Sequence, residues 1–85
     1  MRTHSTNTYF ETQGEAIRYI EEAIAARKYE MAPSDNLRFE HVSYETTVHY
    51  NIPLQRTDGK NTKRWLHIQM YRMHSGRYEA NYYLS

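Results

Sequence analysis

The sequence has no cysteine, only three glycines and only two prolines among its 85 residues. The absence of cysteine excludes a disulfide framework and a thiolate metal site, and it makes the cytoplasm the expected compartment. No apolar run approaches the ~18 residues of a membrane helix and no signal-peptide pattern follows Met1, so we expect no membrane span. The length predicts one small domain over residues 1–85.

Motifs of catalysis are also missing. The glycines do not form a phosphate-binding loop, and no serine stands in a Gly-x-Ser-x-Gly context. In the strand register favoured by the turns, Tyr71 separates Glu45 from Glu79, so these carboxylates do not form a close pair. We therefore expect no enzyme, no cofactor and no small-molecule substrate.

What the sequence does contain is a regular alternation of apolar and polar residues. Side chains alternate faces along a strand, so this pattern predicts three strands that share one buried face. The apolar residues occupy even positions: Val42, Tyr44, Thr46, Val48, Tyr50, Ile52 and Leu54; Leu66, Ile68 and Met70; Tyr78, Ala80, Tyr82 and Leu84.

Gly59 and Gly76 mark matching turns between these strands. Three-residue loops with each glycine in the left-handed conformation keep all even positions on one face, whereas two-residue loops would turn one apolar set to water. The turns are then closed by the pairs Arg56 with Lys60 and Met73 with Arg77.

This register also predicts the residues that lie opposite one another. On the buried face the pairs are Tyr50 with Leu66, Val48 with Ile68, Thr46 with Met70, Ile68 with Tyr82, and Leu66 with Leu84. On the other face they are Asn51 with Trp65, His49 with His67, His67 with Tyr83, and Tyr71 with Glu79. Pro53 falls at a non-hydrogen-bonded site toward the following strand, which favours a sheet edge on its other side.

The first half of the chain predicts one helix. Residues 1–5 are expected to fray, and residues 6–10 are a candidate first strand. Thr12 and Glu15 have the spacing of a capping box, and a helix over about residues 13–30 follows. Leu37 and Phe39 are apolar at odd positions, which predicts a bulge near residues 40–41. The helical apolar stripe comprises Ala16, Ile17, Ile20, Ala23, Ile24 and Met31.

Together these elements predict an α+β fold, with one amphipathic helix on a three- to four-stranded antiparallel sheet in the order β-α-β-β-β. Residues 62–73 are expected to form the central strand. One helix covers one face of such a sheet, so the odd-numbered face is left to solvent or to a partner. Nine tyrosines against two phenylalanines suit such a half-exposed surface.

The odd-numbered face supplies the candidate binding site, and aromatic, Met and His side chains favour a protein interface there. We expect a non-catalytic adaptor or inhibitor that acts as a homodimer or in a hetero-complex. The small size would also suit a protein encoded by a mobile genetic element. Cross-strand packing of these rings with one another is the simpler alternative. The candidate contacts are His49, Trp65, His67, Tyr71, Met73 and Tyr83.

Two further sites are weaker hypotheses. His49 and His67, as cross-strand neighbours, could share a metal, but no third ligand converges on them, so we expect no metal. A basic hairpin end beside Trp65 would suit single-stranded nucleic acid, by phosphate contact and base stacking. Its candidate contacts are Arg56, Lys60, Lys63 and Arg64. A net charge of +1 and the absence of an RNA-recognition motif make this the second choice.

Overall fold

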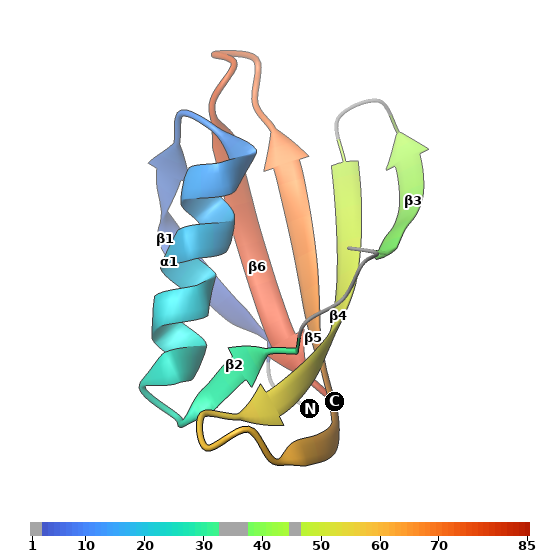
Figure 1. Cartoon of the computed structure of the whole chain (residues 1–85). Helices are drawn as coiled ribbons and strands as arrows, with labels where there is room; N and C mark the ends of the chain where they lie inside the picture. The colour runs from blue at the N-terminus through green and yellow to red at the C-terminus, as the bar shows by residue number, and fades with distance from the viewer. Residues whose placement is uncertain (1–2, 33–37, 45–46) are drawn as a thin grey trace.

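The computed structural model describes residues 3–32, 38–44 and 47–85, and it has one helix packed on an antiparallel sheet (Figure 1). Its elements are β1 (His4–Phe10), α1 (Gln13–Ala25), β2 (Tyr29–Met31), β3 (Arg38–Tyr44), β4 (Thr47–Arg56), β5 (Asn61–Arg72) and β6 (Tyr78–Leu84). Over the described ranges the six strands form one sheet in the order β1-β6-β5-β4-β2, with β3 beside β4. The α+β class and the central place of β5 are confirmed. The predicted order β-α-β-β-β with three to four strands was wrong, because five strands rather than three follow the helix.

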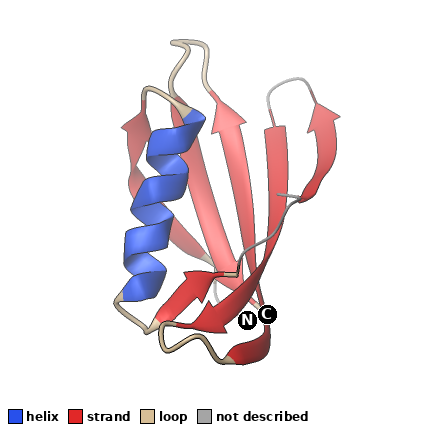
Figure 2. Ribbon diagram, viewed as in Figure 1, coloured by secondary structure: helices blue, strands red, loops and turns tan. Residues whose placement is uncertain are grey.

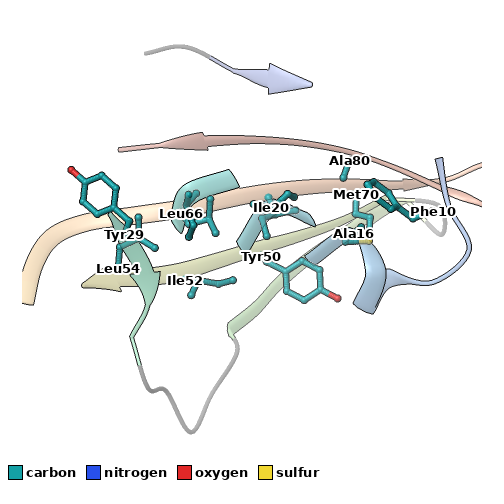
Figure 3. Close-up of a cluster of buried hydrophobic side chains, with 12 residues drawn as sticks. Phe10, Ala16, Ile20, Tyr29, Tyr50, Ile52, Leu54, Leu66, Met70 and Ala80 are labelled. Atoms are coloured by element: carbon teal, nitrogen blue, oxygen red, sulfur yellow. The ribbon is translucent and has the colours of Figure 1, made fainter. Parts of the chain in front are cut away.

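α1 packs against one face of the sheet, and the core lies between them (Figure 3). Ala16, Ile20 and Ile24 are fully buried on the helix, as its apolar stripe predicts. The sheet contributes the other buried apolar side chains: Phe10, Tyr29, Tyr50, Ile52, Leu54, Leu66, Ile68, Met70 and Ala80. No helix in the described part of the chain has the length and hydrophobicity to cross a bilayer.

The helix begins as predicted and ends earlier. Thr12 is the N-cap, and its Oγ1 accepts a hydrogen bond from the Glu15 N–H at 3.2 Å. Glu15 Oε2 reaches back to the Glu11 N–H at 3.1 Å, which completes a variant of the capping box. α1 stops at Ala25, so the prediction of a helix to about residue 30 was wrong.

A left-handed residue and strand pairing explain the early end. Lys28 has φ +64°, which turns the chain away from the helix axis. Tyr29, the next residue, starts β2, which pairs with the end of β4. Met31 packs against the core from this strand, so its spacing of seven from Ile24 mimics a helical position. Tertiary pairing overrides the helical periodicity here.

Both turns have the predicted form. Gly59 and Gly76 have φ values of +88° and +87°, the left-handed conformation that a three-residue loop requires. The Arg56 N–H donates to the Lys60 carbonyl at 2.8 Å, and the corresponding bond in the second turn is 2.7 Å. The β5–β6 register is also confirmed, with Ile68 opposite Tyr82.

The β4–β5 register differs from the prediction by two residues. Tyr50 lies opposite Ile68 rather than Leu66, and Val48 opposite Met70 rather than Ile68. A shift of two preserves the alternation of faces, so the paired residues from Thr47 to Pro53 keep their predicted faces although their partners change.

A bulge in β5 causes this shift. Between the pairs Pro53–Trp65 and Gln55–Asn61, three residues of β5 stand opposite Leu54 alone. Thr62 Oγ1 donates to the Leu54 carbonyl at 2.6 Å and accepts from the Arg64 N–H at 3.1 Å. The hydroxyl thus replaces the backbone N–H that would donate to the Leu54 carbonyl in a regular ladder.

β1, an edge strand of the sheet, carries a similar bulge. The candidate strand at residues 6–10 is confirmed, and it starts at His4, within the stretch expected to fray. Thr6, Asn7 and Thr8 stand opposite Ala80, and Asn7 has φ +55°. Thr6 Oγ1 donates to the Ala80 carbonyl at 3.0 Å. A threonine hydroxyl therefore stabilises the bulge in β5 and the bulge in β1.

The predicted strand from residue 42 to residue 54 is in fact a hairpin. β3 ends at Tyr44, which lies opposite Thr47 at the start of β4. Residue 46, and with it the predicted pair of Thr46 with Met70, lies outside the described residues, as does Leu37. The predicted bulge is confirmed by the register shift between Phe39 and His41. Alternation alone did not reveal this turn, because no glycine or proline marks it.

The prediction for Pro53 is half right. Pro53 lies opposite Trp65, whose N–H and carbonyl both bond to Ser85 on the other side, at 3.3 and 3.0 Å. Pro53 therefore occupies a non-hydrogen-bonded site, where its missing N–H is harmless. The other side is not an open edge, because the Ala32 N–H donates to the Pro53 carbonyl at 2.9 Å.

Candidate protein-binding surface

The outer face is the side of the sheet opposite α1 (Figure 2). It is formed by odd-numbered residues of β4, β5 and β6. Directly opposed residues share a face, so the registers arrange these side chains in cross-strand rows. The rows are Pro53, Trp65 and Ser85; Asn51, His67 and Tyr83; His49, Gln69 and Asn81; and Thr47, Tyr71 and Glu79.

Trp65 stands at one end of the outer face. Its side chain is 37% exposed, while Leu66, the next residue, is fully buried on the helix side. The prediction that Trp65 and the buried Ile68 lie on opposite faces is therefore confirmed. The register places Pro53 beside Trp65 rather than the predicted Asn51, because of the bulge in β5.

Three neighbours position the ring of His67 on the outer face. The ring stacks on Tyr83 with centroids 4.5 Å apart and an interplanar angle of 18°. Nδ1 lies 2.5 Å from Asn51 Oδ1, and Nε2 lies 2.7 Å from Ser85 Oγ. The predicted neighbours His67 and Tyr83 thus meet in a stacked pair.

The predicted pairing of His49 with His67 was wrong. The two-residue shift places Gln69 opposite His49 on β5, and the backbone register of β3 places His41 on its other side. Within residues 3–32, 38–44 and 47–85, no group of three or more His, Cys, Asp or Glu converges in a way that could hold a metal.

Tyr71 lies near the opposite end of the outer face from Trp65. Its hydroxyl donates to Gln69 Oε1 at 3.2 Å, and Glu79 is its predicted neighbour on β6. The pairing of β1 adds Tyr9 beside Glu79, and this ring is 58% exposed. Tyr9 was not among the predicted contacts, because the sequence did not indicate which strand would pair with β1.

Met73 lies just beyond the rows, after the end of β5. It is 37% exposed, and it lines an open hollow of about 460 Å³ with Arg72, His74 and Gly76. The hollow is at the β5–β6 turn, so Met73 extends the outer face past Tyr71 and is not part of its centre.

The outer face carries little charge for a surface of this size. Among the four rows of described residues, Glu79 is the one carboxylate, and no lysine or arginine occurs. The rest of the face consists of Pro53, aromatic rings, imidazoles and side-chain amides or hydroxyls. Such a surface can bury aromatic area and form neutral hydrogen bonds, but its four rows offer no lysine or arginine for a phosphate backbone.

The structure separates the four basic candidates of the hairpin. Arg56 and Arg64 lie over the ring of Tyr29, with guanidinium carbons 4.5 and 5.8 Å from its centroid. Tyr29 is a core residue, so these cations do not share the outer face with Trp65. Lys60 and Lys63 are exposed.

The titration of Tyr50 is clearly perturbed. Burial, with a smaller contribution from Tyr78, raises the pKa of Tyr50 above its ordinary value. Its hydroxyl donates to Gln13 Oε1 at 2.6 Å, which ties the start of α1 to the sheet. This arrangement stabilises the core, and Tyr50 lies on the face opposite the candidate surface.

Comparisons with models of protein families, with curated proteins and with solved structures found no match.

Proposed function

We propose that this chain is a small, non-catalytic protein-binding module, an adaptor or inhibitor, that acts through the outer face. The observation that carries the proposal is a sheet face with exposed aromatic side chains that α1 does not cover. Its partner is a second copy or a different protein, giving a homodimer or a hetero-complex.

The composition of the face supports a protein partner. Trp and Tyr are enriched among residues that dominate binding energy at protein interfaces, and charged residues are depleted from interface centres. Trp65, Tyr71 and Tyr83 supply rings, and the ring of His67 is held by Tyr83, Asn51 and Ser85 within the chain itself. Pre-organised side chains lose less conformational entropy on association.

The test combines sedimentation with affinity capture. Sedimentation equilibrium of the wild-type chain measures self-association, and capture from cell extract on immobilised chain reveals other partners. The Trp65→Ala, Tyr71→Ala double variant should lose either association. Tyr19→Ala is the matched control, because it removes an exposed ring from α1. A wild-type chain that remains monomeric and captures nothing would contradict the proposal, as would equal binding by the double variant.

Single-stranded nucleic acid is the alternative, and salt dependence distinguishes it. Phosphate contacts release counterions, so the slope of log affinity against log salt should flatten by roughly 0.7 for each contact removed from a single strand. Lys63→Ala, Arg64→Ala should then flatten the slope by about 1.4. An aromatic protein interface should depend weakly on salt. Steep, variant-sensitive binding of labelled single-stranded DNA or RNA would favour the alternative.

A further inference from the structure

A second site lies away from the outer face, where the end of α1 meets the β4–β5 turn. Lys28, Arg56 and Lys60 line an open hollow of about 580 Å³ there, together with Thr57 and Asp58. The Thr57 N–H donates to the Lys28 carbonyl at 3.1 Å, which joins the two segments. From this geometry we infer that the hollow binds a phosphate group.

The fold concentrates positive charge at this place. Arg56 also lies over the Tyr29 ring, 4.5 Å from its centroid, and Arg64 lies over the same ring at 5.8 Å. Tyr29 therefore gathers two guanidinium groups beside the two lysines. In the described part of the chain the one salt bridge joins Arg77 to Glu11, so no carboxylate of a described residue lies at ion-pair distance from these four cations.

The one carboxylate in the hollow is turned toward its own backbone. Asp58 Oδ1 accepts a hydrogen bond from the Lys60 N–H at 3.0 Å, which stabilises the turn. With Lys28, Arg56, Lys60 and Arg64 at the same end, the formal charge of this group of five side chains is +3. An anion relieves the mutual repulsion of these cations.

Phosphate is the anion that suits the donors. A guanidinium presents a planar fork of N–H groups that matches phosphate oxygens, and its stacking on a ring pre-organises that fork. Lysines add point charges on flexible stems. With a volume of about 580 Å³ the hollow has room for a phosphate group, and the two sources to distinguish are inorganic phosphate and a nucleoside monophosphate.

Backbone amide NMR with ¹⁵N-labelled chain tests this site. Inorganic phosphate, adenosine 5′-monophosphate and adenosine are titrated separately at an ionic strength held constant with sodium chloride. We expect saturable shifts at Lys28, Thr57 and Lys60 with both phosphates and none with adenosine. Tighter binding of the nucleotide would assign the phosphate to a nucleotide, and equal binding would assign it to phosphate alone.

Paired variants separate the site from general charge effects. Lys28→Asn removes the charge at a left-handed position that asparagine tolerates, and it is combined with Lys60→Gln. This double variant should bind phosphate on the order of tenfold more weakly. Arg18→Gln, Arg72→Gln removes the same charge from exposed positions elsewhere and should bind as wild type. Equal weakening in both variants, non-saturating shifts, or the same shifts with adenosine would overturn the inference.

Discussion

The two faces of β5 carry side chains of similar size, but one face is buried and the other is partly exposed. Leu66, Ile68 and Met70 are at most 1% exposed beneath α1, whereas Trp65, one residue before Leu66, is 37% exposed. Both faces contain large apolar groups, and α1 covers only one of them (Figure 2). Cover by the helix, more than hydrophobicity, therefore separates the side chains that hold the fold from those that stay exposed.

The largest effect is expected on the covered face. Leu66→Ala removes a fully buried side chain beneath the helix, and the lost burial and the cavity should destabilise the fold by about 2–5 kcal/mol. Urea denaturation measures this loss. A change below about 1 kcal/mol, the size expected for a surface site, would mean that the two faces are not distinct.

The turns that set the faces come next. Gly59→Ala or Gly76→Ala should destabilise the fold by about 1–2 kcal/mol, because each position has a strongly positive φ. No neighbouring atom lies within 4 Å of an added Cβ, so this cost is backbone strain and not a clash. Gly14→Ala in α1 is the control with the opposite sign, expected to stabilise by about 0.5–1 kcal/mol. Thermal unfolding measures the stability of all three variants. Equal effects of the turn variants and Gly14→Ala would show that the turns do not require glycine.

Tyr50 tests the polar boundary of the covered face. Tyr50→Phe loses the hydrogen bond to Gln13 and should destabilise by about 0.5–1.5 kcal/mol at neutral pH. Because the folded chain raises the pKa of Tyr50, its contribution is present below pH ~10 and is lost as pH rises toward the folded pKa.

The phenylalanine variant should lose less stability than wild type across that alkaline range. Urea denaturation at pH 7 and at several pH values above 9 measures both effects. A parallel decline in the two proteins would show that Tyr50 does not contribute to the pH dependence.

The smallest effect on stability is expected on the outer face. Trp65→Ala removes cross-strand contacts worth about 0.2–1 kcal/mol each, without opening a cavity in the core. The same urea experiment should show a loss well below that of Leu66→Ala. A loss of several kcal/mol would place Trp65 in the core.

The sequence predicted the face of each side chain better than the residue opposite it on the next strand. Period-2 alternation assigned Leu66 inward and Trp65 outward correctly, because one face of the sheet had to be buried. Glycine chemistry identified both turns of the β4–β5–β6 meander. These signals are local, and they depend on residues within a few positions of each other.

The missed features depend on contacts that are distant in sequence. The bulge at Thr62 depends on the carbonyl of Leu54 across the sheet, and nothing in its local sequence distinguishes it from a regular strand. β2 forms where Tyr29 meets Arg56, against a helical pattern. For the same reason the sequence did not place Tyr9 on the outer face, Lys28 beside the basic turn, or Gln69 opposite His49.

The fluorescence of Trp65, the only tryptophan in the chain, tests the role of the outer face most directly. Emission and acrylamide quenching are recorded for the free monomer and for the complex, whether the self-associated species seen by sedimentation or the captured hetero-complex. Binding through the outer face predicts a shift of emission to shorter wavelength and weaker quenching in the complex. Unchanged emission and quenching in a complex confirmed by sedimentation would contradict the proposed surface.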